Sequence, residues 1–184
     1  EYDLAKLDAV ISDKTRLIAL GYASNIFGTI NPVKDICEKA RSIGALSFID
    51  AVAFAPHGPI DVSVLGCDFL VCSTYKFYGP HQGILYGRRE VLETLTPYKV
   101  RPAPEALPDC FETGTQNHEC LAGILGMLEY LEGLADPGLE NRQARLHNAM
   151  ANLEAYEAQL GWQLIDGIKD VPGLKIHGIT NPNR

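Results

Sequence analysis

The stretch "CSTYKFYGPHQGILYG", residues 72–87, decides the fold expected for this sequence. It begins at the end of an apolar run, "FLVC" at 69–72, which predicts a short buried strand. It ends in "GILYG" at 83–87, which predicts another strand. The turn between them contains a Gly-Pro pair and one lysine, Lys76, with aromatic residues on both sides. A lysine at the end of a buried strand is either a solvated ammonium or a group held for chemistry, and the surrounding pattern decides between the two.

Strands and helices alternate before this stretch. "RLIAL" at 16–20 and "ALSFI" at 45–49 predict two further buried strands. The segment between them, 31–44, has its apolar residues on one helical face, with Asn31 suited to cap its start and Gly44 to end it. Strand and helix in alternation, with short connections, favour an α/β fold. We expect a three-layer arrangement in which a mostly parallel sheet has helices on both faces.

The character of the sequence changes after residue 88. Residues 91–110 contain four prolines and predict a long irregular loop, of a kind that is often functional. Regularly spaced apolar residues then predict two long helices, around 121–128 and 146–160. The final segment, "GLKIHGITNPNR" at 173–184, predicts the beginning of a strand.

Composition excludes several classes of protein. The 184 residues suffice for one α/β domain, and a net charge of −7 without a Lys/Arg run argues against nucleic-acid or anionic-membrane partners. No apolar run approaches the roughly 20 residues of a membrane span, and the first ten residues lack the basic start and apolar stretch of a signal peptide. Five cysteines without a C-x-x-C pair and five scattered histidines predict reduced thiols, a cytoplasmic protein and no metal.

Polar residues directly follow the predicted parallel strands. In an open parallel sheet, ligands bind at these carboxyl ends of the strands. Asn25 follows the first strand, Asp50 the second, and Ser73, Thr74 and Lys76 the third. A lysine and a carboxylate brought together suit pyridoxal phosphate. The lysine can form a Schiff base with the aldehyde, and a carboxylate can keep the pyridine nitrogen protonated. Asp and Lys are nevertheless common at strand ends, so the pattern leaves simple surface roles open.

Three ordered segments carry a resemblance to a known family. They are "YASNIFGTINPV" (22–33), "FIDAVAFAPHGPIDVSVLGCDFLVCSTYKFYGPHQGILYG" (48–87) and "FETGTQNHECLAG" (111–123). The sequence resembles the class V aminotransferase family of fold-type I pyridoxal-phosphate enzymes, especially its cysteine-desulfurase-like branch. The resemblance covers roughly residues 16–125 and implies a large domain like that of pyridoxal-phosphate-dependent transferases, incomplete at both ends.

The resemblance implies roles for particular residues. Lys76 matches the Schiff-base lysine, and Asp50 matches the partner of the pyridine nitrogen. Ser73 and Tyr75 resemble phosphate-binding positions just before the lysine. Asn25, in the S-N-x-x-G element, resembles the family asparagine near the cofactor ring and the substrate carboxylate. The alternative for Asn25 is a turn residue that caps the next helix.

Further positions have two interpretations each. Thr115, in "ETGT", resembles the threonine that reaches the phosphate across a dimer interface, which implies a homodimer. Alternatively, it caps the helix that follows. His57 matches a family histidine, for which we expect a packing role. His81 and the segment "NHE" at 117–119 belong either to the rim of the site or to the surface.

The sequence departs from the desulfurase pattern at four places. Ala53 stands where a glutamine would contact the ring hydroxyl, Tyr75 replaces the histidine before the lysine, and Tyr22 stands where desulfurases often have histidine. The expected glycine-rich loop reads "VRPAPEAL" at 100–107. A tyrosine before the lysine resembles kynureninase. Desulfuration, aminotransfer and kynureninase-like cleavage are therefore all open as reactions.

We expect an enzyme that uses pyridoxal phosphate to act on a small amino acid substrate, and a chain that is part of a longer polypeptide. Its expected divisions are the central part of the cofactor-binding large domain (1–135), a long helical connection (136–170) and the start of the C-terminal small domain (171–184). The alternative from a different class is a catalytically silent fragment or interaction domain. A nicotinamide-binding domain is a weaker option, because no G-x-G-x-x-G follows the first strand.

Overall fold

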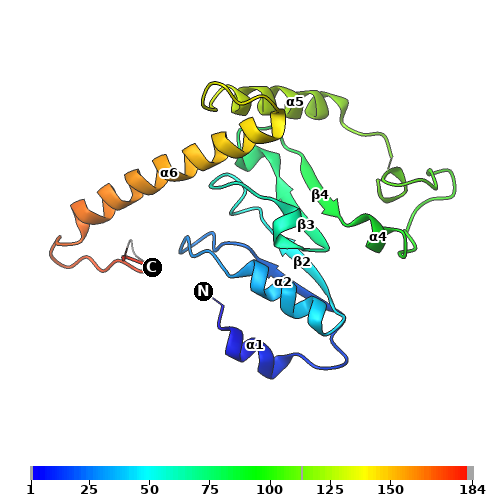
Figure 1. Cartoon of the computed structure of the whole chain (residues 1–184), viewed down its shortest axis with the longest axis horizontal. Helices are drawn as coiled ribbons and strands as arrows, with labels where there is room; N and C mark the ends of the chain where they lie inside the picture. Colours follow the sequence, from blue (N-terminus) through cyan, green and yellow to red (C-terminus); the bar gives the residue numbers. More distant parts are fainter. Residues whose placement is uncertain (1, 113, 182–184) are drawn as a thin grey trace.

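A four-stranded sheet forms the centre of the molecule, with its strands in the order β1-β2-β3-β4 (Figure 1). The computed structural model describes residues 2–112 and 114–181. β1 (Leu17–Gly21), β2 (Leu46–Asp50) and β3 (Phe69–Ser73) are parallel, and β4 (Gly83–Gly87) runs antiparallel to β3. The prediction of an α/β fold with a mostly parallel sheet is confirmed.

One face of the sheet carries the main hydrophobic core. Leu20, Ile49, Leu70 and Tyr86 are partners in register across the four strands, so their side chains form an apolar row on this face. The helix α2 (Val33–Ser42) and the short α3 (Val62–Leu65) pack over this row and bury it. Burial of such apolar side chains is the main stabilising contribution to the fold.

The start and the end of α2 differ in how well they follow the sequence pattern. Gly44, just beyond the helix, has φ +72°, the left-handed conformation expected of a glycine that ends a helix. The prediction that Asn31 caps the start is wrong, since the side-chain amide of Asn31 donates to Gly21 O at 2.9 Å instead. Gly21 ends an edge strand, and its carbonyl takes this side-chain partner in place of a strand neighbour.

The opposite face of the sheet is more open. The short helix α4 (Arg89–Leu92) lies at one end of it, where Leu92 packs so closely on Gly87 that a Cβ there would be 2.8 Å from the leucine. Elsewhere on this face Leu17 is 51% exposed and Leu85 is 57% exposed. The helix α1 (Leu4–Val10) lies beside β1, and its N-terminal N–H groups are capped by the side chain of Asp3.

Two long helices follow the irregular segment, as predicted. They are α5 (His118–Glu132) and α6 (Arg142–Ile168), which pack against each other around Met127, Leu131 and Met150 (Figure 1). Glu132 at the end of α5 accepts hydrogen bonds from Arg142 and Arg145 of α6. These bonds hold the pKa of Glu132 below its usual value.

The predicted strand at 173–184 is not found. Residues 171–181 contain neither helix nor strand, and 182–184 lie outside the described residues. A strand needs a neighbour to satisfy its backbone groups, and the described sheet ends at β1 and β4 without including this segment. The division of the chain into domains stays a prediction.

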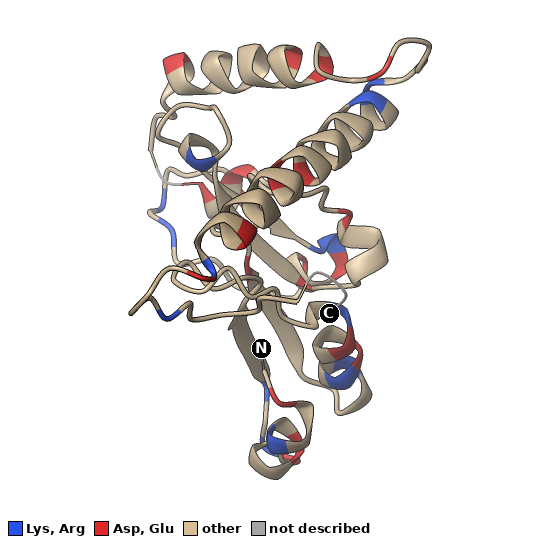
Figure 2. Ribbon diagram, turned by 90° about the vertical axis from the view of Figure 1, so that its left-hand side faces the viewer, with Lys and Arg blue, Asp and Glu red and all other residues tan. Residues whose placement is uncertain are grey.

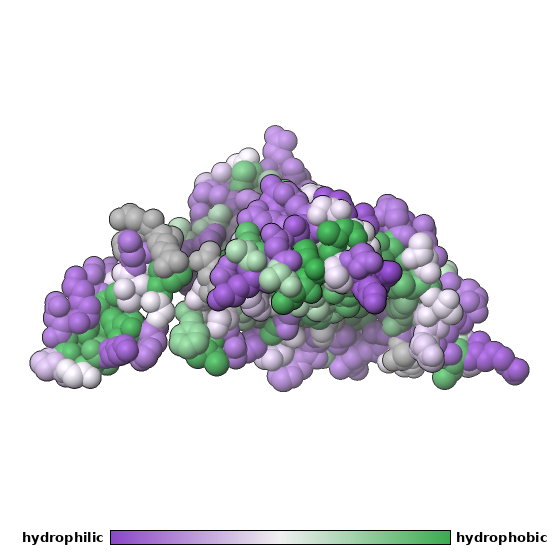
Figure 3. All heavy atoms as spheres, turned by 90° about the horizontal axis from the view of Figure 1, so that it is seen from below, coloured by the Kyte–Doolittle hydropathy of each residue, from purple (hydrophilic) through white to green (hydrophobic). Residues whose placement is uncertain are grey.

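The surface is polar in character but interspersed with apolar patches. Figure 2 shows acidic and basic residues mixed along α1 and α2. Figure 3, a view onto the side that bears α1, shows apolar patches between polar ones. Among the described residues, no helix is both long and apolar enough to cross a membrane.

Candidate active site at the carboxyl edge of the sheet

The three parallel strands end at one edge of the sheet, and candidate residues lie along it. The register pairs Gly21 of β1 with Asp50 of β2, and Asp50 in turn with Val71 of β3. Asp50 is therefore central at this carboxyl edge. Ser73 ends β3, and Lys76 follows in a 3₁₀ turn, Thr74–Lys76.

Two glycines leave space beside the candidate side chains. Gly21 is the register partner of Asp50, and Gly83 is the register partner of Ser73, so all four residues belong to the same face of the sheet. A Cβ built on Gly83 would meet nothing within 4 Å, and one on Gly21 would meet only Ala23 O, at 3.7 Å. We call these four residues the glycine-flanked face. Glycine within a strand is typical of places where a ligand approaches the backbone closely.

Within the part of the chain that the structure describes, the Asp50 carboxylate forms no ion pair and is held by a backbone hydrogen bond. Its side chain is exposed, and Oδ1 accepts a hydrogen bond from Val52 N–H at 2.9 Å. Tyr22 N–H donates to the main-chain carbonyl of Asp50 at 2.8 Å. The ring of Tyr22 stacks on Phe54 at 3.9 Å between centroids, which braces the loops that follow β1 and β2. Burial raises the pKa of the Tyr22 hydroxyl.

Lys76 extends from a tightly fixed turn. Its side chain is exposed, and its Nζ lies over the ring of Tyr75, 5.3 Å from the centroid. The turn is fixed by Thr74, whose side chain is 0% exposed. Thr74 Oγ1 donates to Pro80 O at 2.5 Å and is also 3.1 Å from Gln82 O. The anchoring role of Thr74 was not recognised from the sequence, although a small hydroxyl residue directly after a buried strand was the available signal.

Asn25 lies in the turn after β1. The turn is closed by Ser24, whose Oγ accepts hydrogen bonds from the backbone N–H groups of Ile26 and Phe27. Since α2 begins at Val33, Asn25 does not cap it, and that alternative is wrong. The Asn25 side chain lines a hollow of about 620 Å³ together with Ala53 and residues of α6. His57, also in this hollow, pairs with Glu157 of α6 at 2.6 Å and so ties the loop after β2 to the long helix.

Thr115 lies outside this edge. It is exposed in the segment between α4 and α5 and lines a hollow with other residues of that segment. The alternative that Thr115 caps α5 is wrong, because Asn117 Oδ1 accepts the hydrogen bond from Cys120 N–H at 3.0 Å. The structure thus brings Asn25, Asp50, Ser73 and Lys76 to one edge of the sheet, with Thr115 on a separate segment.

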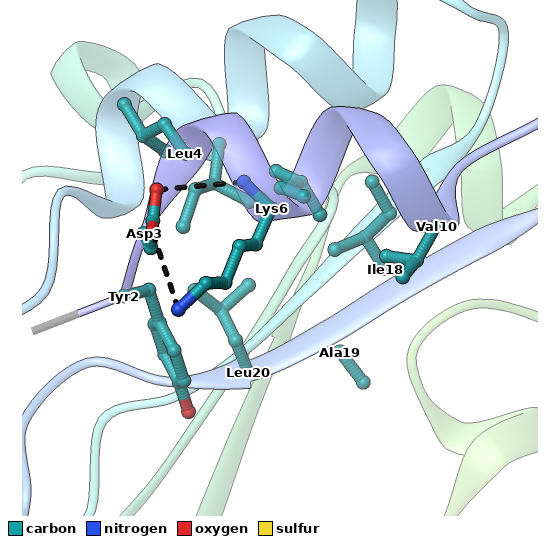
Figure 4. Close-up of a pocket in the computed structure, with 10 residues that line it drawn as sticks. Tyr2, Asp3, Leu4, Lys6, Val10, Ile18, Ala19 and Leu20 are labelled. Carbon is teal, nitrogen blue, oxygen red and sulfur yellow. Dashed lines mark hydrogen bonds and ion pairs between the residues drawn. The ribbon is translucent and has the colours of Figure 1, made fainter.

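A further hollow, of about 400 Å³, lies between α1 and β1 (Figure 4). Its walls include Leu4, Val10 and Ile18, and its two charged residues, Asp3 and Lys6, pair with each other at 3.5 Å. The residues that line this hollow include none of the strand-end groups Asn25, Asp50, Ser73 and Lys76. Within the described part of the chain, no cluster of three His, Cys, Asp or Glu side chains is placed to hold a metal ion.

The sequence matches the family described as aminotransferase class V over residues 1–183. The chain belongs to the class V aminotransferase family. Within it, the chain is 34% identical over 190 residues to a probable cysteine desulfurase of Synechocystis, and 35% identical over 170 residues to a cysteine desulfurase of Yersinia pestis. These matches cover 98% and 83% of this chain, but 42% and 41% of the two relatives.

Solved structures of cysteine desulfurases show the same fold. The cysteine desulfurase CsdA from Escherichia coli superposes with a TM-score of 0.75 at 28% identity, over 93% of this chain and 42% of that one. An apo cysteine desulfurase from Thermococcus onnurineus gives a TM-score of 0.69 at 25% identity, over 88% of this chain and 46% of that one. The chain therefore spans less than half the length of these relatives.

Class V aminotransferases use pyridoxal phosphate, and the residues at the carboxyl edge fit that cofactor. An amine, a carboxylate and a hydroxyl lie at the ends of adjacent strands, contributed by Lys76, Asp50 and Ser73. A Cβ on Gly83 would meet nothing within 4 Å and one on Gly21 only Ala23 O, so no side chain covers either backbone position. The donor set and the uncovered glycines thus agree with the group that the family implies.

Proposed function

We propose that this chain carries the cofactor site of a pyridoxal-phosphate-dependent enzyme that acts on an amino acid. The observation that carries the proposal is the glycine-flanked face, with Asp50 at its centre and the Lys76 turn directly after β3. When bound, pyridoxal phosphate supplies an electron sink that accepts negative charge from the substrate's α-carbon.

Each residue then has a distinct task. Lys76 would hold the cofactor through its amine and would hold the proton that moves at the substrate's α-carbon. Asp50 would partner the pyridine nitrogen and stabilise its positive charge. Ser73 and Tyr75 would donate hydrogen bonds to the phosphate, and Asn25 would orient the ring and the substrate carboxylate.

The assembly that we propose is a homodimer in the cytoplasm. Thr115 would reach the phosphate of the partner's site, which agrees with its exposed position on a segment apart from the chain's own carboxyl edge. The net charge of −7 favours neither nucleic acid nor an anionic membrane as a partner.

Cysteine desulfuration is the reaction that the relatives support, since the Synechocystis and Yersinia pestis proteins are both named for it. Ala53 favours a second candidate, aminotransfer or kynureninase-like cleavage. Its methyl group lines the hollow beside Asn25, where a desulfurase glutamine would offer a hydrogen-bond donor. A catalytically silent fragment is the remaining alternative for this chain, because it spans 42% of the Synechocystis relative.

The proposal is tested by adding pyridoxal phosphate and recording the visible absorbance of the lysine-bound cofactor. Borohydride reduction and peptide mapping then locate the attachment. We expect the label on Lys76 and unchanged labelling in the matched control Lys34→Ala, which removes another exposed lysine. Label spread over surface lysines, or none at all, would overturn the proposal for this chain.

The reaction needs a separate experiment on a longer polypeptide that includes these residues. Incubation with a panel of amino acids, scored for sulfide, alanine and keto acids, distinguishes the candidates. Sulfide from cysteine supports desulfuration, and keto acids support aminotransfer. Binding of the cofactor without turnover of any substrate supports the silent alternative.

A further inference from the structure

We infer that His81 is a positioning residue, whose imidazole holds the ring of Tyr75 beneath the Lys76 ammonium and so sets the direction in which that amine points. The inference rests on the proposed function, in which Lys76 is the reactive lysine. It assigns a task to a histidine that the sequence left between the rim of the site and the surface.

The ring of Tyr75 contacts both of the other two side chains. The rings of His81 and Tyr75 are 4.5 Å apart between centroids and inclined by 18°, and Lys76 Nζ lies 5.3 Å from the centroid of Tyr75. Tyr75 is 45% exposed, so solvent leaves much of its ring unrestrained. The stack with His81 therefore decides how the Tyr75 ring is oriented, and the ring decides where the ammonium is attracted.

The backbone of His81 is anchored to the core on both sides. Its neighbours Pro80 and Gln82 both present their carbonyls to Thr74 Oγ1, and Thr74 N–H donates to Gln82 O at 2.9 Å. Gln82 N–H donates back to Pro80 O at 2.8 Å, which closes a tight turn around His81. Because Thr74 is fully buried, the histidine is attached to a rigid point although its own side chain is exposed.

Other residues already hold this turn against α5. Phe77 packs into the apolar cluster around Met127 and Leu131, and Tyr78 makes an edge contact with Tyr130 at 5.8 Å between ring centroids. The His81–Tyr75 stack lies on the exposed side of the same turn and adds nothing to that cluster. Its remaining consequence is local, and it concerns the orientation of Lys76.

Orientation matters for an attacking amine because reaction requires the nitrogen to approach the carbonyl carbon from a narrow range of directions. A lysine side chain has four rotatable bonds and samples many directions when it is unrestrained. An aromatic ring held below the ammonium restricts that sampling, so that the neutral amine, formed when the ammonium gives its proton to solvent, starts from a defined direction. Loss of His81 should therefore slow the attachment of an aldehyde at Lys76 without unfolding the turn.

The first experiment needs no cofactor. The lysines of the chain are reductively methylated with ¹³C-formaldehyde, and the Lys76 methyl resonance is assigned by its absence in Lys76→Arg. A methylated amine above an aromatic ring shows an upfield ring-current shift. We expect this shift in the wild type, its loss in Tyr75→Leu and in His81→Ala, and its retention in His81→Phe, which keeps a ring to stack. His147→Ala, which removes an exposed histidine on α6, is the matched control.

The second experiment measures the rate at which borohydride-trapped pyridoxal phosphate accumulates on Lys76. We expect His81→Ala to lower this rate by about tenfold to a hundredfold, the range for a misplaced reacting group, and His81→Phe to restore it. Retention of the thermal melting curve shows that each variant folds. His81→Gln, which preserves polarity without a ring, replaces His81→Ala if the latter unfolds, and should show the same loss.

The outcomes separate the two proposals. Absence of label on Lys76 in the wild type overturns the proposed function, while the ring-current shift still tests the stack. Labelling and shift that are both unchanged in the ring-less variants overturn the role of His81 and leave the proposed function standing. A third outcome would also overturn the role of His81. If His81→Ala loses both the Lys76 label and the ring-current shift, and His81→Phe restores neither, ring stacking is not the cause of the loss.

Discussion

The two edges of the sheet carry similar residues but use them differently. Asp68, at the amino edge of β3, is buried and accepts hydrogen bonds from the backbone N–H and the hydroxyl of Ser47, at 2.8 and 3.0 Å. Its other carboxylate oxygen pairs with Arg88 at 2.7 Å. Asp50, at the carboxyl edge of β2, is exposed, and among the described residues its carboxylate accepts a single hydrogen bond, from Val52.

The difference shows how structural and functional polar groups can be distinguished within one sheet. At the amino edge the carboxylate is satisfied on both oxygens by its own chain, so it stabilises the fold and has little left to offer a ligand. At the carboxyl edge the Asp50 carboxylate has Gly21 as one register partner and Val71 as the other, and no side chain extends over it from the glycine. The predictions below test this contrast, from the largest expected effect to the smallest.

Lys76→Ala should abolish attachment of pyridoxal phosphate completely, because no other amine lies at the same place in the turn after β3. Its free energy of unfolding should stay within about 0.5 kcal/mol of the wild type, as for other exposed positions. Absorbance of the bound cofactor and urea unfolding measure the two quantities. If pyridoxal phosphate still attaches to this variant, the carboxyl edge does not carry the cofactor site that distinguishes it from the amino edge.

Asp68→Ala should lower the free energy of unfolding by about 3 kcal/mol, because Arg88 and the Ser47 groups lose their buried partner. Asp50→Ala is the matched variant at the other edge and should change it by less than about 0.5 kcal/mol. Urea unfolding at neutral pH measures both. Equal destabilisation by the two substitutions would show that the edges do not differ as described.

Thr74→Val keeps the volume of a buried side chain and removes its hydroxyl. Pro80 O then loses its hydrogen bond from Oγ1, and we expect a loss of about 1–2 kcal/mol in the free energy of unfolding. The turn that carries His81 should also loosen, which the Lys76 ring-current shift reports. A variant as stable as the wild type, with the shift intact, would show that Thr74 does not anchor the turn.

Cys67, next to Asp68 at the amino edge, should show the smallest effect, visible only in alkaline solution. Burial, assisted by the neighbouring Cys37, raises the pKa of its thiol from 9.0 to about 11. The folded state thus retains the proton more strongly than the unfolded state. The stabilisation is complete below pH 9 and is lost as the pH rises from 9 towards 11.

Urea unfolding between pH 8 and pH 11 measures this dependence. Cys67→Ala should flatten the decline over that interval relative to the wild type, while Cys120→Ala, which removes a less buried thiol, should leave it unchanged. An identical decline in all three proteins would show that Cys67 does not contribute to it.

The sequence predicted the strands well because their signals are local. Apolar runs of four or five residues bounded by glycine and charged residues identified all four strands to within one residue of their observed ends. The parallel order of three of them follows from the helices that connect them. The prediction of a strand at 173–184 was wrong because a strand also needs a neighbouring strand to pair with. A local sequence pattern does not reveal whether such a neighbour is present.

The candidate site was predictable in part. Asn25, Asp50, Ser73 and Lys76 were identified from their places after strands, and the topology brings them to one edge. Gly21 and Gly83 were missed, because their importance lies in the register between strands rather than in the sequence around them. The stack of His81 on Tyr75 was missed because it depends on how the turn between residues 73 and 83 closes.

The open side of β1 has a practical consequence for handling the protein. Within the described residues β1 pairs with no strand other than β2, so the backbone groups on its other side have no strand partner, although Gly21 O accepts from the Asn31 side chain. Leu17, half exposed on the strand, adds apolar surface beside those groups. Such an edge can recruit a strand from a second molecule. We expect concentrated samples to self-associate through β1, and Ala19→Lys, a charge on this edge strand, to keep them monodisperse.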